Sequence, residues 1–173
     1  MNDDRAFRRP DSLRLGRHDY RSRGAYYVTL CSHERQRIFS TVVDCGPPRL
    51  SPLGEIARDT LLELPAHYRD VRVDEWVAMP DHIHAILWLR SEGLDDLPVE
   101  FSSLSEVVRG FKSLSAKRIN RALGTPGAPV YQRGFFDRVI RDERELGDTR
   151  VYIRRNPQRW LDRYGAGVPA SWR

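Results

Sequence analysis

The stretch VRVDEWVAMPDHIHAILWL, residues 71–89, decides the fold. Two β-branched and aromatic runs flank Pro80-Asp81, and this pattern predicts a β-hairpin with a short turn. Side chains alternate along a strand, so His82 and His84 project from one face of the second strand, about 7 Å apart. Ile83, Ala85, Leu87 and Leu89 alternate with them and point to the other face, where we expect helices to cover them.

Two more segments predict strands. Residues 25–32 (AYYVTLCS) and 135–141 (FFDRVIR) are rich in β-branched and aromatic side chains. Residues 40–50 lie between regular elements, and Pro47 and Pro48 predict a loop without regular structure there.

Three segments predict helices, because each combines a start signal with charged or apolar residues at helical spacing. The first has a serine N-cap and a proline at its first position, the second has a capping box and a glycine just past its end, and the third precedes an Asn-Pro pair. Their boundaries are marked by Ser51-Pro52 and Pro65, by Ser103, Glu106 and Gly124, and by Asp142 and Asn156.

The order of these elements is β-α-β-β-α-β followed by a C-terminal helix. It predicts an α+β fold of the ferredoxin-like, split β-α-β kind: a four-stranded antiparallel sheet with helices on one face. The other face is then free to hold a site. We expect one domain over residues 1–173, with a basic extension (1–24) before the first strand and a basic aromatic tail (157–173) after the last helix.

Charge is distributed unevenly along the 173 residues, whose net charge is +5. Residues 1–40 carry 9 basic and 5 acidic residues, residues 41–100 carry 5 and 12, and residues 101–173 carry 15 and 7. The two basic ends favour a polyanion such as nucleic acid as the partner. An arginine-rich composition without a specific partner is the alternative.

Several protein classes are excluded by composition. No apolar run reaches the length of a membrane span, and the first residues lack the apolar stretch of a signal peptide, so we expect a cytoplasmic protein. Cys31 and Cys45 form neither a C-x-x-C pair nor a disulfide framework, which agrees with a reducing compartment.

The histidine pair is the first candidate site. His82 and His84 are spaced so that they can share one divalent metal ion, and histidine is the commonest metal ligand. An H-x-H strand is a weak signal by itself, because two polar residues on a partly exposed strand give the same pattern. Tyr152 and Asn156, four residues apart on the last helix, share a helical face. Core packing of Tyr152 and a capping role for Asn156 before Pro157 remain alternatives.

Four motifs together resemble a known family. PDHIHAILWL (80–89) resembles the His-hydrophobic-His strand of the HUH single-strand endonucleases, and RGFFDRVIRDERELGDTRVYIRRNPQRW (133–160) is similar to the Tyr-Ile-x-x-Asn-Pro segment of their one-tyrosine transposases. GAYYVTLCSHERQRIFS (24–40) and VVRGFKSLSAKRIN (107–120) are also similar to that branch. The combination resembles the IS200-like, REP-associated tyrosine transposases.

The resemblance implies a mechanism. His82, His84 and Asn156 match the positions that hold one Mg²⁺ or Mn²⁺ ion in that family, and an amide oxygen suits such a cation. Tyr152 matches the nucleophile that attacks the phosphorus, releases a 3′-hydroxyl and keeps the 5′ end of single-stranded DNA beside a hairpin. Family members occur as monomers and as homodimers, and the sequence does not choose between them.

DNA-binding residues are predicted from charge alone. Basic side chains on the second predicted helix, just before the third and on the third could neutralise phosphates. They are Lys112, Lys117, Arg118 and Arg121, then Arg141, and then Arg154 and Arg155. Aromatic residues of the tail could stack on unpaired bases: Trp160, Tyr164 and Trp172. The alternatives are a domesticated DNA-binding protein that does not cut, and a ferredoxin-like RNA-binding module.

Overall fold

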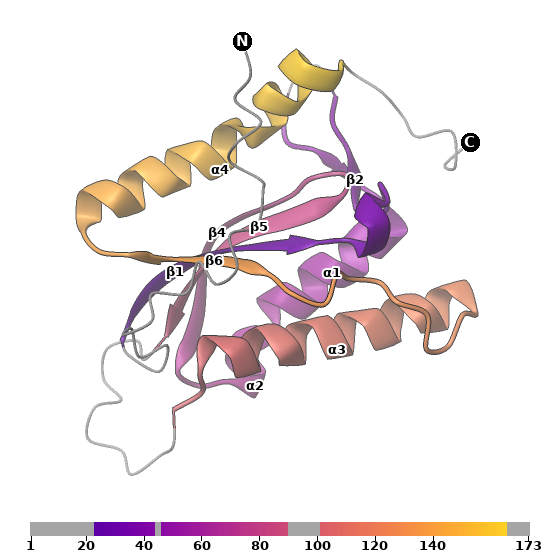
Figure 1. Ribbon diagram of the computed structural model, residues 1–173, viewed down its shortest axis with the longest axis horizontal. Coiled ribbons are helices and arrows are strands. Elements are labelled where there is room, and N and C mark those ends of the chain that lie inside the picture. The colour runs from indigo at the N-terminus through magenta and orange to yellow at the C-terminus, as the bar shows by residue number, and fades with distance from the viewer. Residues whose placement is uncertain (1–22, 44–45, 90–100, 166–173) are drawn as a thin grey trace.

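A four-stranded antiparallel sheet forms the centre of the computed structural model, which describes residues 23–43, 46–89 and 101–165. The strand order is β4-β5-β1-β6 (Figure 1). The strands are β1 (Gly24–Cys31), β4 (Val71–Ala78), β5 (His82–Leu89) and β6 (Phe136–Ile140). This is the strand order of a split β-α-β unit, so the predicted ferredoxin-like fold class is confirmed.

Helices α1 (Pro52–Leu62) and α3 (Leu104–Leu123) cover one face of the sheet (Figure 1). The Ser51 hydroxyl accepts a hydrogen bond from the Gly54 amide at 2.8 Å and caps α1, as predicted. Ser103 and Glu106 form the predicted capping box of α3. The aliphatic residues of β5 that alternate with the histidines lie in the core beneath these helices, as expected from the strand period: Ile83, Ala85, Leu87 and Leu89.

Short elements depart from the prediction in two places. Residues predicted as an irregular loop contain β2 (Ser40–Thr41) and β3 (Arg49–Leu50), which pair with each other on either side of the proline pair. Pro65 does not end helical structure, because α1 ends at Leu62 and Pro65 lies in the first turn of α2 (Leu64–His67). Proline lacks an amide hydrogen, but amide hydrogens in the first turn of a helix have no partner within the helix, so proline is tolerated there. A 3-10 turn, η2 (His33–Arg35), follows β1.

Helix α4 (Glu143–Tyr164) covers part of the other face of the sheet and is longer than predicted. The expected end at Asn156, with a separate tail after it, is wrong: the helix continues through Pro157 to Tyr164. Pro157 is buried, and Trp160 and Leu161 beyond it pack against the second core. This packing offsets the cost of an interior proline. Among the described residues, no helix is both long and apolar enough for a membrane span.

A bulge in β4 fixes the position of α4. The pairing register shifts between Val73 and Trp76, so Asp74 and Glu75 together oppose one residue of β5. Asp74 accepts two hydrogen bonds from the Arg150 guanidinium, at 2.7 and 2.8 Å. On the next turn of α4, Arg154 is paired with Glu75 at 2.6 Å. The bulge therefore presents two carboxylates to two arginines of α4 and anchors the helix over β4.

Candidate active site on the second face of the sheet

The two histidines of β5 meet on the face covered by α4. The Nε2 atoms of His82 and His84 lie 3.0 Å apart, and the two side chains are almost fully buried. The prediction that they share a face is therefore confirmed by their positions on the strand. Two imidazole lone pairs at this distance repel each other unless a proton or a cation lies between them.

His82 is oriented by the residue before it. Its Nδ1 atom contacts Asp81 Oδ1 at 2.5 Å, and Asp81 Oδ2 is paired with Arg35 Nε at 3.2 Å. A carboxylate accepts, so Nδ1 of His82 carries a hydrogen atom and the Nε2 atom faces His84. Such a partner fixes the tautomer and ring orientation that a metal-binding histidine needs.

His84 is held by two hydroxyl groups of β1. Its Nδ1 atom lies 2.6 Å from the Tyr27 hydroxyl and 2.9 Å from Thr29 Oγ1. Burial lowers the pKa of His84 well below its usual value, and the neighbouring His82 lowers it further. His84 is therefore neutral. A hydroxyl both donates and accepts, so these partners allow the tautomer of His84 whose Nε2 lone pair faces the Nε2 atom of His82.

Tyr152 and Asn156 come to the histidines from α4. The Tyr152 ring packs edge-on against His84, with centroids 5.8 Å apart, and against Tyr27 at 6.1 Å. Asn156 is 9% exposed and its amide nitrogen donates to the Tyr152 carbonyl at 3.1 Å. Its side chain also bonds to His84, which raises the pKa of His84 against the larger effect of burial. The structure thus brings together all four residues that the sequence analysis selected.

This donor set fits a divalent cation. Two imidazole nitrogen atoms converge, and the oxygen of the Asn156 amide is the remaining hard donor on the side of α4. Within the described residues, no group of three His, Cys, Asp or Glu side chains could hold a metal ion. The Asn156 amide oxygen is the third donor that the family resemblance leads us to expect.

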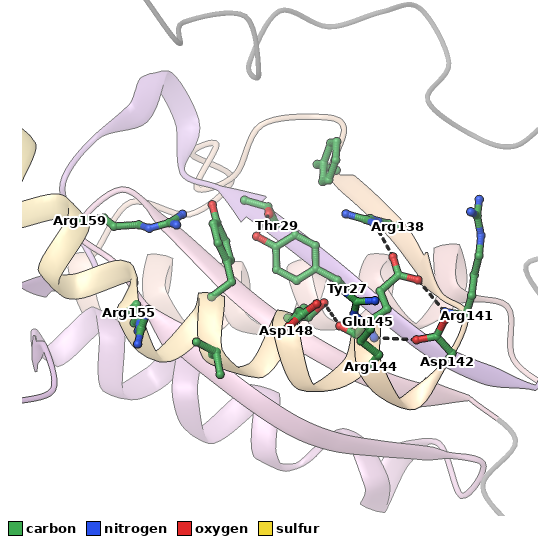
Figure 2. A pocket seen from close by; sticks show the side chains of 14 residues that line it. Tyr27, Thr29, Arg138, Arg141, Asp142, Arg144, Glu145, Asp148, Arg155 and Arg159 are labelled. Atoms are coloured by element: carbon green, nitrogen blue, oxygen red, sulfur yellow. Dashed lines mark hydrogen bonds and ion pairs between the residues drawn. The ribbon is translucent and has the colours of Figure 1, made fainter.

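The nucleophile candidate borders an open groove of about 850 Å³ (Figure 2). Its walls are β1 and β6 on one side and the first five turns of α4 on the other. The Arg159 guanidinium carbon lies 4.9 Å from the centre of the Tyr152 ring. Burial raises the pKa of the Tyr27 hydroxyl, and the adjacent Tyr152 raises it too, while the Thr29 hydroxyl lowers it. Tyr27 therefore remains protonated and is a hydrogen-bonding partner of Tyr152, not a base.

The predicted DNA-binding residues divide into three groups. Arg141 and Arg155 line this groove. Arg154, one turn from Arg150 on the same helix, is engaged with Glu75 and anchors α4.

The other four predicted contacts lie on α3, across the sheet from the histidines: Lys112, Lys117, Arg118 and Arg121. Lys112 donates to the backbone carbonyls of Gln132, Arg133 and Gly134 and so fixes the segment that leads into β6. Arg118 is paired with Glu63 at 2.7 Å. The structure does not bring the α3 group to the candidate site.

The aromatic residues of the expected tail also divide. Trp160 packs over His82, with ring centroids 6.2 Å apart, and the Arg37 guanidinium lies 5.3 Å from its centre. Tyr164 packs against Trp160 and is half exposed. Trp172 and most of the basic extension 1–24 lie outside the described residues.

Sequence reasoning missed five residues of this site: Tyr27, Thr29, Asp81, Phe136 and Arg159. The period of β1 offered a signal for two of them, because Tyr27 and Thr29 alternate with the core residues Tyr26 and Val28. Only the pairing of β1 with β5 places both beside His84.

Comparison with known proteins supports the fold. No family model matches the chain. An uncharacterized protein of Haemophilus influenzae is 29% identical over 164 residues, which cover 86% of this chain and 88% of that protein. A solved structure of a REP-associated tyrosine transposase bound to a REP hairpin has 20% sequence identity and a TM-score of 0.58, and the match covers 83% of this chain and 72% of the other. At this identity the likeness establishes a shared fold.

Proposed function

We propose that this protein is an IS200-like, REP-associated tyrosine transposase: a metal-dependent endonuclease and strand transferase for single-stranded DNA beside hairpins. One observation carries the proposal. Tyr152 packs directly on His84, whose Nε2 atom faces that of His82, while Asn156 closes the same cluster from one turn further along α4. Core packing alone does not require four such side chains at one point. The shared fold with a transposase that binds a REP hairpin supports DNA as the substrate.

Mg²⁺ or Mn²⁺, held by His82, His84 and Asn156, would polarise the scissile phosphate and neutralise charge that develops on it. The Tyr152 oxygen attacks the phosphorus and forms a phosphotyrosine bond to the 5′ side of the break. The bond between the phosphorus and the 3′ oxygen breaks; the phenol loses its proton to solvent, and the 3′ oxygen takes up one proton as it leaves as a hydroxyl. Another 3′-hydroxyl reverses this step, so the bond energy is conserved in the phosphotyrosine and no nucleotide cofactor is needed.

The surrounding residues support this step. The protonated Tyr27 hydroxyl lies beside Tyr152 and would donate a hydrogen bond to negative charge on the Tyr152 oxygen. The Arg159 guanidinium packs on the Tyr152 ring and so lies beside the phosphate that the tyrosine attacks.

The test is a cleavage assay on a mixed pool of single-stranded hairpin DNAs with Mn²⁺. We expect a protein–DNA adduct that resists denaturant in the wild type and is absent in Tyr152→Phe. Tyr164→Phe, on the same helix and half exposed, is the matched control and should form the adduct normally. An adduct that persists in Tyr152→Phe would contradict the assignment of the nucleophile. DNA binding without any adduct would favour a DNA-binding protein that does not cut.

A further inference from the structure

The groove beside Tyr152 exists because α4 crosses the sheet obliquely. The helix begins directly after β6, at one edge of the sheet, and packs on β4 and β5 at the other edge (Figure 1). It therefore leaves open the face of β6 at Phe136, which is paired with the buried Thr29 of β1. The groove of about 850 Å³ occupies this space and opens onto Tyr152.

Phe136 is an exposed aromatic residue inside this groove. It is 40% exposed and projects from the edge strand to the same face as Tyr27. The two rings pack edge to face with centroids 6.4 Å apart, and Tyr27 packs in the same way on Tyr152. The side chains thus form a row, Tyr152, Tyr27 and Phe136, in which only the last ring is open enough to receive a flat ligand.

The walls around this ring are rich in arginine. Five arginines line the groove: Arg138, Arg141, Arg144, Arg155 and Arg159. Arg138 is paired with Glu145, and Figure 2 shows it entering the groove from β6 while Arg159 extends from the opposite end. Within the described residues, Arg141, Arg144 and Arg159 form no ion pair with a carboxylate. Three acidic residues share the lining, so the groove carries a net positive charge.

We propose that this groove is a binding subsite for the unpaired DNA strand next to the cleavage point, with Phe136 stacking on one base and the unpaired arginines contacting phosphates. The inference rests on the proposed function for the identity of the polymer. An exposed ring among guanidinium groups matches the two needs of a single strand, because every base has a face for stacking and every nucleotide carries a charge. A paired base offers no free face, so the subsite selects single-stranded DNA. Only Tyr27 separates Phe136 from Tyr152, so the stacked base is close to the phosphate that is attacked.

The test measures binding without cleavage. A fluorescein-labelled, mixed-sequence single strand is titrated with protein carrying Tyr152→Phe, in EDTA, and anisotropy is recorded. In that background Phe136→Ala should weaken binding by about fivefold to 150-fold, the range of one base–aromatic stack. Phe136→Tyr keeps the ring and should restore the affinity. Leu123→Ala, an exposed apolar residue at the end of α3, is the control and should bind like the parent.

Two further readouts separate stacking from general damage. With 5-iododeoxyuridine in the strand, irradiation should cross-link the DNA to the β6 peptide in the parent protein and not in Phe136→Ala. Arg141→Gln should lower the slope of log affinity against log salt by about 0.7, the value for one lost phosphate contact on a single strand. The same change at Arg121, on α3, should leave the slope unchanged.

The inference is overturned if Phe136→Ala binds like the Leu123→Ala control, or if Phe136→Tyr binds as weakly as Phe136→Ala. These outcomes are independent of the chemistry. If the wild type forms no adduct, but Phe136→Ala binds the single strand more weakly than its parent, the cleavage proposal fails and the subsite stands. If the wild type forms the Tyr152 adduct and Phe136→Ala binds normally, the subsite alone fails.

Discussion

The anchor between α4 and the bulge of β4 yields a prediction whose size follows from its geometry. Asp74 is 7% exposed at its side chain and Arg150 is 35% exposed, and two hydrogen bonds join them. An ion pair on the surface contributes about 0.2–1 kcal/mol, whereas a hydrogen bond to a buried charged group contributes about 1.5–3 kcal/mol. This pair is buried on one side only. We therefore expect a coupling free energy of about 1–2 kcal/mol.

The perturbation is a double-mutant cycle with Asp74→Ala, Arg150→Ala and both changes together. Asp74→Ala also removes the acceptor of the Trp88 indole N–H, so it should cost about 2–3 kcal/mol and exceed the loss in Arg150→Ala. Urea unfolding followed by circular dichroism gives the four free energies of unfolding. The adduct yield should fall in Asp74→Ala, because α4 carries Tyr152 and loses its fixed position over β4.

A matched cycle on the exposed neighbours Arg58 and Asp59 controls for charge removal alone, and its coupling should be smaller. The reasoning would be refuted by an Asp74–Arg150 coupling below about 0.5 kcal/mol, the level at which independent sites already deviate from additivity. It would also be refuted by an unchanged adduct yield in a variant that has lost this coupling.

Three other predictions concern the site and its support. Tyr27→Phe removes a hydroxyl that orients His84, so Mn²⁺ affinity without DNA, measured by electron paramagnetic resonance, should fall by about 10-fold to 100-fold; unchanged affinity contradicts this role. The folded chain holds His84 neutral, whereas the unfolded chain binds a proton there below about pH 6.5. The free energy of unfolding without metal should therefore fall as the pH drops below 6.5, by at most ~1.4 kcal/mol per pH unit. Thermal melts should show a shallower fall in His84→Asn and the full fall in a control variant, His67→Gln. Lys112→Met should lower the melting temperature and leave affinity for single-stranded DNA unchanged; a loss of affinity at normal stability would make Lys112 a DNA contact.

Local signals were sufficient to predict most of the fold. Strand alternation assigned His82 and Ile83 to opposite faces, and capping residues marked where the helices begin. These patterns depend on neighbours within a few positions of the chain, so they can be read without knowledge of the tertiary structure. The element order then left the ferredoxin-like sheet as the simplest arrangement.

Long-range packing decided what the sequence did not predict. A proline after Asn156 normally argues for a helix end, but the contacts of Trp160 with the second core extend α4 beyond it. Tyr27 has the appearance of an ordinary strand residue until β1 pairs with β5. Lys112 resembles a phosphate contact because only the folded chain brings three backbone carbonyls to its ammonium group.

Trp160 is an intrinsic fluorescent probe beside the candidate site. Its indole ring lies 6.2 Å from the ring of His82 and 5.3 Å from the Arg37 guanidinium carbon. Indole emission responds to charges and quenchers at such range, so we expect a cation bound at the histidine pair to change the fluorescence of this residue. The difference in emission between the wild type and Trp160→Phe isolates that signal from the other tryptophans. Occupancy of the histidine pair can therefore be followed in real time, with no label, no DNA and no turnover.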